Sequence, residues 1–199
     1  MIKAAEITKR QQDIVDAAKK IVTADGFDRL TVREIAARLK VTDGALYRHF
    51  KSKKDIVSLL IDDVERTLLE VVDAAAEKAP DPLGKLKSIF SVHVLYAEKR
   101  KGLTFIVINE TLSMKDSVLR RKMQDVVNAY LKRIRVILVA GIKKKVFRDD
   151  LDVRLTGLVF FGLVQSLVTM WGLSGHIFRM DRQHINGLFD LYKKSIIRK

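Results

Sequence analysis

The stretch TVREIAARLKVTDGALYRHF, residues 31–50, decides the fold because it encodes two short helices joined by a tight turn. Thr31 is a good N-cap, and Glu34 stands three residues on, where a capping box places an acidic partner. The apolar residues that follow have helical spacing: Val32, Ile35, Ala36 and Leu39. Thr42 is the predicted cap of the second helix, in which Leu46 and Phe50 lie four residues apart on one face. Two short helices with so short a connection must cross steeply, which is the geometry of a helix-turn-helix.

The outer face of the second helix has the composition of a DNA-reading surface. In a helix-turn-helix this helix enters the major groove with its N-terminal residues at the base edges. Gly44 and Ala45 let the backbone approach the duplex closely, and the hydroxyl of Tyr47 can donate to a phosphate. Lys53 adds a positive charge at the start of the next helix, where an anion is already favoured. With Leu46 and Phe50 facing inward, the predicted exposed residues are Thr42, Asp43, Gly44, Ala45, Tyr47, Arg48 and His49.

Helical periodicity continues on both sides of this motif. Ahead of it, one apolar face ends at the sequence DGF, residues 25–27, and consists of Ile14, Ala17, Ala18, Ile21 and Val22. After it, a long helix is predicted over residues 53–79, up to the break at Pro80 and Pro82. Later helices are predicted near residues 83–98, 117–145, 152–173 and 181–197. The run LTFIVINET, residues 103–111, suits a strand or a helix, and we predict a helix because a lone strand would have no partner.

The charge of the chain favours an anionic partner. Its net charge of +14 attracts polyanions such as nucleic acid, although a basic protein that binds a membrane surface would have the same charge. The absence of cysteine excludes disulfides and thiolate zinc sites. The four histidines lack metal-ligand spacing, and no glycine-rich phosphate loop follows a strand, so we predict neither an enzyme nor a cofactor.

The N-terminus lacks the apolar core of a signal peptide, which predicts a cytoplasmic protein. The apolar run over residues 155–175 approaches membrane-spanning length, but it contains Gln165, Ser166 and several glycines. We therefore interpret it as a buried interface helix and predict no membrane partner.

Residues 26–60 resemble the N-terminal signature of the TetR family of transcriptional regulators. The matching positions are Gly26, Phe27, Thr31, Ile35, Ala36, Val41, Gly44, Leu46, Tyr47, Phe50, Ser52 and Lys53. The resemblance implies DNA contacts from Thr31 and Arg33, from Thr42, Asp43, Gly44, Tyr47 and His49, and from Lys53 to phosphate. Arg48 is a further candidate because of its predicted exposure. Asp43 departs from the lysine or glutamine common in the family; it would repel phosphate but can accept a hydrogen bond from a cytosine amino group.

The fold implied is all-α, with a three-helix DNA-binding domain at residues 1–55 and a helical ligand-binding and dimerisation domain at residues 56–199. The helix over residues 53–79 connects the two. The resemblance also implies a homodimer formed by the last two helices. The sequence agrees independently, because a helix that is apolar all round needs more burial than one small bundle provides. Two recognition helices would then meet major-groove faces about 34 Å apart on a near-palindromic operator.

Two functions remain open for a DNA-binding protein of this kind. The first is a repressor released by a small hydrophobic or amphipathic effector, although the candidate pocket residues are equally typical of core packing. The second is an architectural or nucleoid-associated factor without an inducer, suggested by basic clusters at residues 98–101, 120–123, 131–135 and 143–148. The candidate pocket residues are Phe90, His93, Tyr96, Phe105, Asn109, Met114, Met123, Gln165, Met170 and Trp171.

Overall fold

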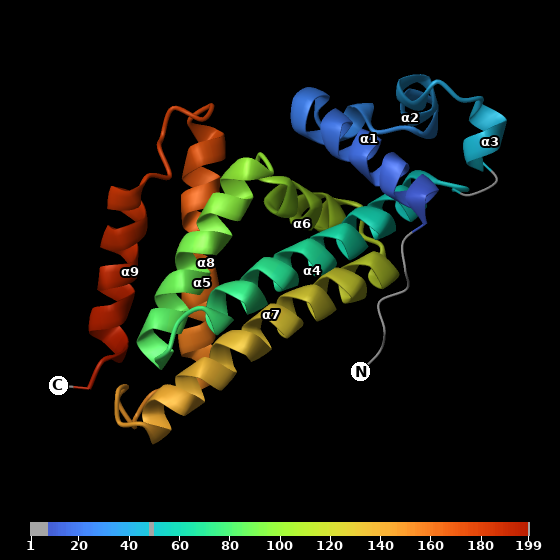
Figure 1. Cartoon of the computed structure of the whole chain (residues 1–199). Coiled ribbons are helices and arrows are strands. Elements are labelled where there is room, and N and C mark those ends of the chain that lie inside the picture. The colour runs from blue at the N-terminus through green and yellow to red at the C-terminus, as the bar shows by residue number, and fades with distance from the viewer. Residues whose placement is uncertain (1–7, 48–49, 199) are drawn as a thin grey trace. The chain divides into compact units, whose positions relative to one another are not determined.

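The computed structural model describes residues 8–47 and 50–198, and Figure 1 shows that these residues are helical apart from turns and connections. An isolated antiparallel bridge joins Phe147 to Ile197. The prediction of an all-α fold is confirmed, and the ambiguous run at residues 103–111 is helical. In chain order the elements are α1 Lys9–Asp25, the 3-10 helix η1 Phe27–Arg29, α2 Val32–Leu39, α3 Asp43–Tyr47, α4 Lys53–Glu77, α5 Pro82–Lys99, α6 Leu103–Ser113, α7 Ser117–Lys143, α8 Val153–Leu173 and α9 Arg182–Ile196.

The chain divides into two compact units. The first contains residues 1–67 and 103–126, and the second contains residues 68–102 and 127–199. Helices α4 and α7 each contribute residues to both units. The domain boundary predicted between residues 55 and 56 lies within α4 in the first unit, so a separation at that point remains a prediction.

Helix α1 packs through the apolar face that its sequence predicts. The side chain of Thr8 accepts a hydrogen bond from the N–H of Gln11, and the Gln11 side chain accepts from the N–H of Thr8, which completes a capping box. The helix ends at Gly26, whose φ of 85° is available to glycine without strain. The buried residues include the predicted set Ile14, Ala17, Ala18, Ile21 and Val22.

The turn between α2 and α3 is made by Lys40 in a left-handed conformation, with φ 54° and ψ 45°. The N–H of Val41 donates to the carbonyl of Ala36 at 3.0 Å, which closes the end of α2. At the other end of α2, the hydroxyl oxygen of Thr31 accepts from the N–H of Glu34 at 3.0 Å, as predicted. Leu46 in α3 is 1% exposed, so this short helix is anchored to the core by its inner face.

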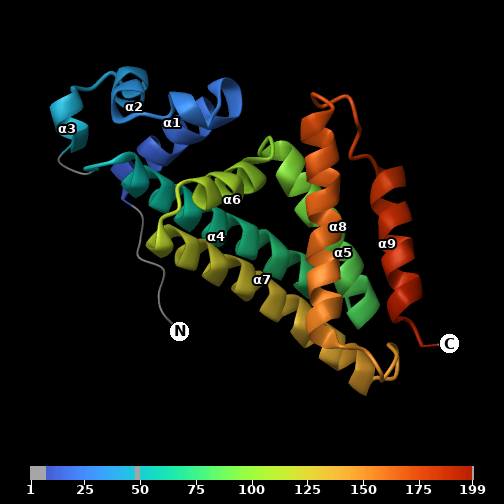
Figure 2. The ribbon, with the colours of Figure 1, turned by 180° about the vertical axis from the view of Figure 1, so that it is seen from behind.

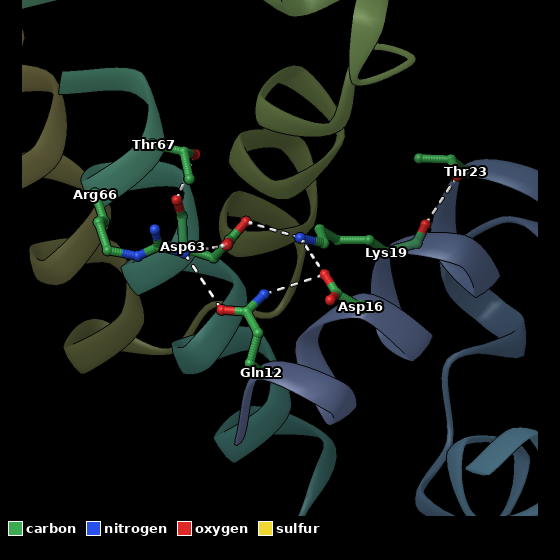
Figure 3. Close-up of polar contacts among 7 residues, drawn as sticks. All are labelled: Gln12, Asp16, Lys19, Thr23, Asp63, Arg66 and Thr67. Atoms are coloured by element: carbon green, nitrogen blue, oxygen red, sulfur yellow. Dashed lines mark hydrogen bonds and ion pairs between the residues drawn. The ribbon is translucent and has the colours of Figure 1, made fainter. Parts of the chain in front are cut away.

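A polar network joins α1 to α4 within the first unit, as Figure 3 shows. Asp63 of α4 is fully buried, and its carboxylate lies 3.6 Å from Lys19 Nζ and 3.1 Å from a guanidinium nitrogen of Arg66. Lys19 also pairs with Asp16 at 2.6 Å. Because a buried carboxylate is costly without compensating charge, Lys19 and Arg66 stabilise Asp63 in this position. The network therefore fixes the packing of α1 on the first part of α4.

The second unit has α5, α8 and α9 side by side, as both Figure 1 and Figure 2 show. Its core is aromatic, and the Phe90 and Phe160 rings meet edge to face with centroids 5.6 Å apart. Phe147, in the connection between α7 and α8, is completely buried against Gly141. A β-carbon at position 141 would overlap the Phe147 ring, so only glycine fits there.

Helix α8 exposes an apolar stripe within this single chain. By length and composition alone it could cross a membrane, and 28% of its most apolar window is buried. Its inner side packs on α5 and α9. Leu155, Leu158 and Val159 lie along one face, and seven residues after Val159, about two helical turns, Ser166, Met170 and Leu173 continue it at intervals of four and three.

Candidate nucleic-acid interface

The predicted recognition surface on α3 is open to solvent at most of its described positions. Thr42, Asp43 and Gly44 are exposed, and Tyr47 is 52% exposed. Ala45 is half-buried. The predicted contacts from Arg48 and His49 lie outside the described residues. The start of α3 and the residue before it therefore expose a threonine, a carboxylate and a phenol, while Leu46 is buried.

Thr31 and Arg33 stand at the start of α2. Both side chains are exposed, and the Thr31 hydroxyl serves as the N-cap while its own hydrogen remains able to donate. Among the described residues, the Glu34 carboxylate has no hydrogen bond to the N–H of Thr31, so the capping box is not completed. The carboxylate lies 3.3 Å from Arg38 Nε instead. Arg38 also pairs with Asp25, which ties α2 to the end of α1.

Lys53 is held inside the first unit rather than extended into solvent. Its Nζ donates to the carbonyl of Phe27 at 2.9 Å and lies 4.7 Å from the centroid of the Phe27 ring. The same ammonium lies 3.8 Å from Oε1 of Glu110 in α6. A phosphate contact from Lys53 would therefore have to compete with these three interactions. The sequence motif did not indicate the partners, because Phe27 and Glu110 are distant from Lys53 along the chain.

The N-terminus of α4 is partly satisfied by its own chain. The carboxylate of Asp55 accepts from the N–H groups of Lys51 at 2.7 Å and Ser52 at 3.0 Å. These bonds stabilise the first turn of α4 in the manner of a cap. They also place a negative charge beside the position where the phosphate contact of Lys53 is predicted.

The predicted effector-pocket residues are distributed over both units. In the first unit Met123 is buried, Phe105 and Met114 are half-buried, and Asn109 is exposed with its amide donating to the Phe105 carbonyl at 2.9 Å. In the second unit the buried members are Phe90, His93, Tyr96 and Trp171, whereas Gln165 is half-buried and Met170 is 52% exposed. Their role in binding an effector remains a prediction.

His93 has a buried partner that the sequence did not indicate. Its Nδ1 lies 3.0 Å from the hydroxyl of Tyr130 in α7, and both residues are buried. Burial lowers the pKa of His93 to about 4, and burial raises the pKa of Tyr130. Near neutral pH the imidazole is therefore uncharged and the phenol is protonated. No short sequence pattern links these residues, because they come from different helices.

The residues that the structure describes contain no group of three or more histidine, aspartate or glutamate side chains able to hold a metal ion. What they do contain is a pair of short helices, α2 and α3, joined by a tight turn, and the second of them exposes polar groups. This arrangement defines a helix-turn-helix DNA-binding protein.

Residues 14–60 match the family described as "Bacterial regulatory proteins, tetR family", and residues 62–192 match "YsiA-like protein, C-terminal region". The chain belongs to the TetR family of bacterial regulators. It is a DNA-binding transcription regulator, and regulators of this family are not enzymes.

The similar proteins include a regulator of fatty-acid metabolism and a nucleoid occlusion factor. The "Fatty acid metabolism regulator protein" of Bacillus subtilis (strain 168) is 28% identical over 162 residues, which is 81% of this chain and 83% of that protein. A "Nucleoid occlusion factor SlmA" of Idiomarina loihiensis is 23% identical and covers 98% of both chains. The structure of FadR from Bacillus subtilis in complex with stearoyl-CoA is 26% identical, with a TM-score of 0.78 over 93% of this chain and 98% of that chain.

Gly44→Ala tests whether the backbone of α3 approaches DNA closely. A β-carbon at Gly44 would meet nothing within 4 Å in the free protein, and alanine favours helix by about 1 kcal/mol. We therefore expect an unchanged or higher melting temperature together with a loss of operator affinity of about tenfold, which corresponds to about 1.4 kcal/mol. Thermal unfolding and fluorescence anisotropy with labelled operator measure the two effects. Full affinity in the variant would remove Gly44 from the close contact.

Tyr47→Phe tests the predicted phosphate contact. Loss of one hydrogen bond to a charged group should weaken operator and unrelated DNA equally, by about five- to tenfold, which is on the order of 1 kcal/mol. Lys53→Ala should weaken both as well, but it should also lower the melting temperature because the Phe27 and Glu110 contacts are lost. A changed base preference in Tyr47→Phe would contradict the phosphate assignment.

Proposed function

We propose that this protein is a repressor that binds a near-palindromic operator as a homodimer and is released by a small hydrophobic or amphipathic effector. The observation that carries the proposal is the exposure of Thr42, Asp43 and Tyr47 at α3, which the buried Leu46 anchors to the core. Thr31 and Arg33 would add contacts beside it, and Lys53 would reach a phosphate once it leaves Phe27. Arg48 and His49 are proposed to contact DNA as well, on the basis of the sequence.

The homodimer is supported by the apolar stripe on α8. Leu155 is 61% exposed, Leu158 is 53% exposed and Leu173 is 79% exposed. On α9, Leu191 is 62% exposed. Exposed apolar side chains on these two helices favour burial against a second copy, with α8 and α9 forming the interface.

The proposal of an effector is supported by a similar protein whose structure contains a bound ligand. FadR from Bacillus subtilis was crystallised with stearoyl-CoA, and its fold matches this chain over most of both lengths. We infer that this protein also responds to a ligand with a large apolar part. Within the second unit, the proposed pocket residues are Phe90, His93, Tyr96, Gln165, Met170 and Trp171, with Tyr130 added because it contacts His93.

The alternative function is an architectural or nucleoid-associated factor without an effector. It is favoured by the likeness to the nucleoid occlusion factor of Idiomarina loihiensis, which spans 98% of both chains. The two functions differ in the ratio of specific to non-specific affinity, which is large for a repressor and small for a DNA-coating protein.

Selection from random duplex DNA tests these proposals. The purified full-length protein is incubated with the pool at near-physiological salt, and the retained duplexes are sequenced. One near-palindromic motif with about one helical turn between half-site centres is the expected result. A pool without a motif would contradict the repressor proposal and favour the architectural function. Once a motif is known, acyl-CoA thioesters of different chain lengths can be tested for release of the operator.

A further inference from the structure

The second unit contains a groove of about 390 Å³ between the end of α4, the start of α5 and the second half of α7. Its apolar lining includes Val72, Ile89, Val136 and Ile137. Val72 and Ile89 are completely buried, whereas Val136 is 62% exposed at the groove's edge. A bound apolar chain would cover Val136 and the half-buried Ala76, and removing them from water is favourable in proportion to the area covered.

The charged side chains of the groove are predominantly basic. Lys85 and Lys132 line it, and neither side-chain ammonium group has a hydrogen bond or ion pair to any described residue. Arg133 and Asp73 also line it, but they neutralise one another through two bonds, from Nε to Oδ1 at 2.6 Å and from Nη2 to Oδ2 at 2.7 Å. Asp73 therefore leaves the two ammonium groups uncompensated.

Arg133 also stabilises one wall of the groove. Its Nη1 donates to the carbonyl of Ala129 at 3.1 Å, so the guanidinium is fixed from both sides. The arrangement combines an apolar lining, a fixed wall and two lysines without local partners. None of these groove residues belongs to the effector pocket predicted from the sequence.

We propose that this groove binds an amphipathic anion, with its alkyl chain on Ala76, Val136 and the edge of Ile137 and its carboxylate or phosphate between Lys85 and Lys132. Neutral amphiphiles lack the charge that the lysines recognise, and cationic amphiphiles are repelled by them. Binding at the groove does not depend on the proposed release from an operator. The two can therefore be measured separately.

The direct test is calorimetric titration of the full-length protein with octanoate and octyl phosphate, which carry the two possible anionic groups on one chain length. Octanol is the neutral control. We expect both anions to bind at least fivefold more tightly than octanol, with the tighter anion identifying the preferred head group. Binding of octanol as tightly as the anions would overturn the proposal, as would no binding of either anion.

The variants locate the binding site. Lys85→Gln combined with Lys132→Gln should weaken anion binding at least fivefold, and Val136→Glu should abolish it. Lys87→Gln, which changes an exposed lysine of α5 outside the groove lining, should bind as the wild type does. Since Val136 is exposed, Val136→Glu is expected to fold, and thermal unfolding checks this. Wild-type binding by both the double variant and Val136→Glu would overturn the assignment to this groove.

Operator binding separates this inference from the proposed function. An anion that binds the wild type, fails to bind the double variant and leaves operator affinity unchanged would support the groove and contradict its use as the effector site. If acyl-CoA releases the operator equally from the wild type and the double variant, the effector binds elsewhere. The calorimetric titration would still show whether the groove binds an anion.

Discussion

Leu158→Arg is expected to make the protein monomeric and to lower its operator affinity by about 10²-fold to 10⁴-fold. Leu158 is 53% exposed in the single chain and lies on the apolar stripe of α8, so the arginine should not disturb folding of one copy. In the proposed dimer interface, however, the charge would be buried without a partner. Two half-sites would then bind independently, and the gain from linking them would be lost.

Sedimentation velocity and operator titration measure the two consequences together. Leu112→Arg is a matched control, because Leu112 is 60% exposed but lies in α6 outside the proposed interface. The control should remain dimeric and should bind the operator normally. A dimeric Leu158→Arg protein with full affinity would show that α8 does not form the interface.

Acidification from pH 7 to pH 5 is expected to reduce the free energy of unfolding by about 2 kcal/mol through His93 alone. The pKa of His93 is lowered from 6.5 to about 4 by burial. Below pH 6.5 the unfolded chain binds a proton that the folded protein excludes, so stability is lost as the pH falls from 6.5 towards 4. Above pH 6.5 this residue makes no contribution to the pH dependence.

Urea unfolding at pH 7 and pH 5, at one protein concentration, measures this effect. His93→Gln should be less stable at pH 7, because the packing around Tyr130 is altered. Between pH 7 and pH 5, however, it should not lose the further free energy of unfolding, about 2 kcal/mol, that the wild type loses. His176→Gln, which changes an exposed histidine, should retain the wild-type pH dependence. An unaltered pH dependence in His93→Gln would show that another group is responsible.

Local chemistry explains which parts of the protein were predictable. The cap at Thr31, the buried face of α1 beginning at Ile14 and the inward position of Leu46 are set by residues within one or two turns of each other. The helix-turn-helix therefore followed from residues 31–50, and the helical state of residues 103–111 followed from the lack of a strand partner. The left-handed conformation of Lys40 was not predictable, since lysine carries no preference for it.

The sequence by itself determined the helices, the family and the residues proposed to face DNA, because these depend on periodicity and on a compact motif. Only the tertiary structure decided that Lys53 is held by Phe27 and Glu110, and that His93 meets Tyr130. It also brought Lys85 and Lys132 to one groove. Each of these pairings joins different helices or distant segments, and only packing of those segments brings their side chains within a few ångströms.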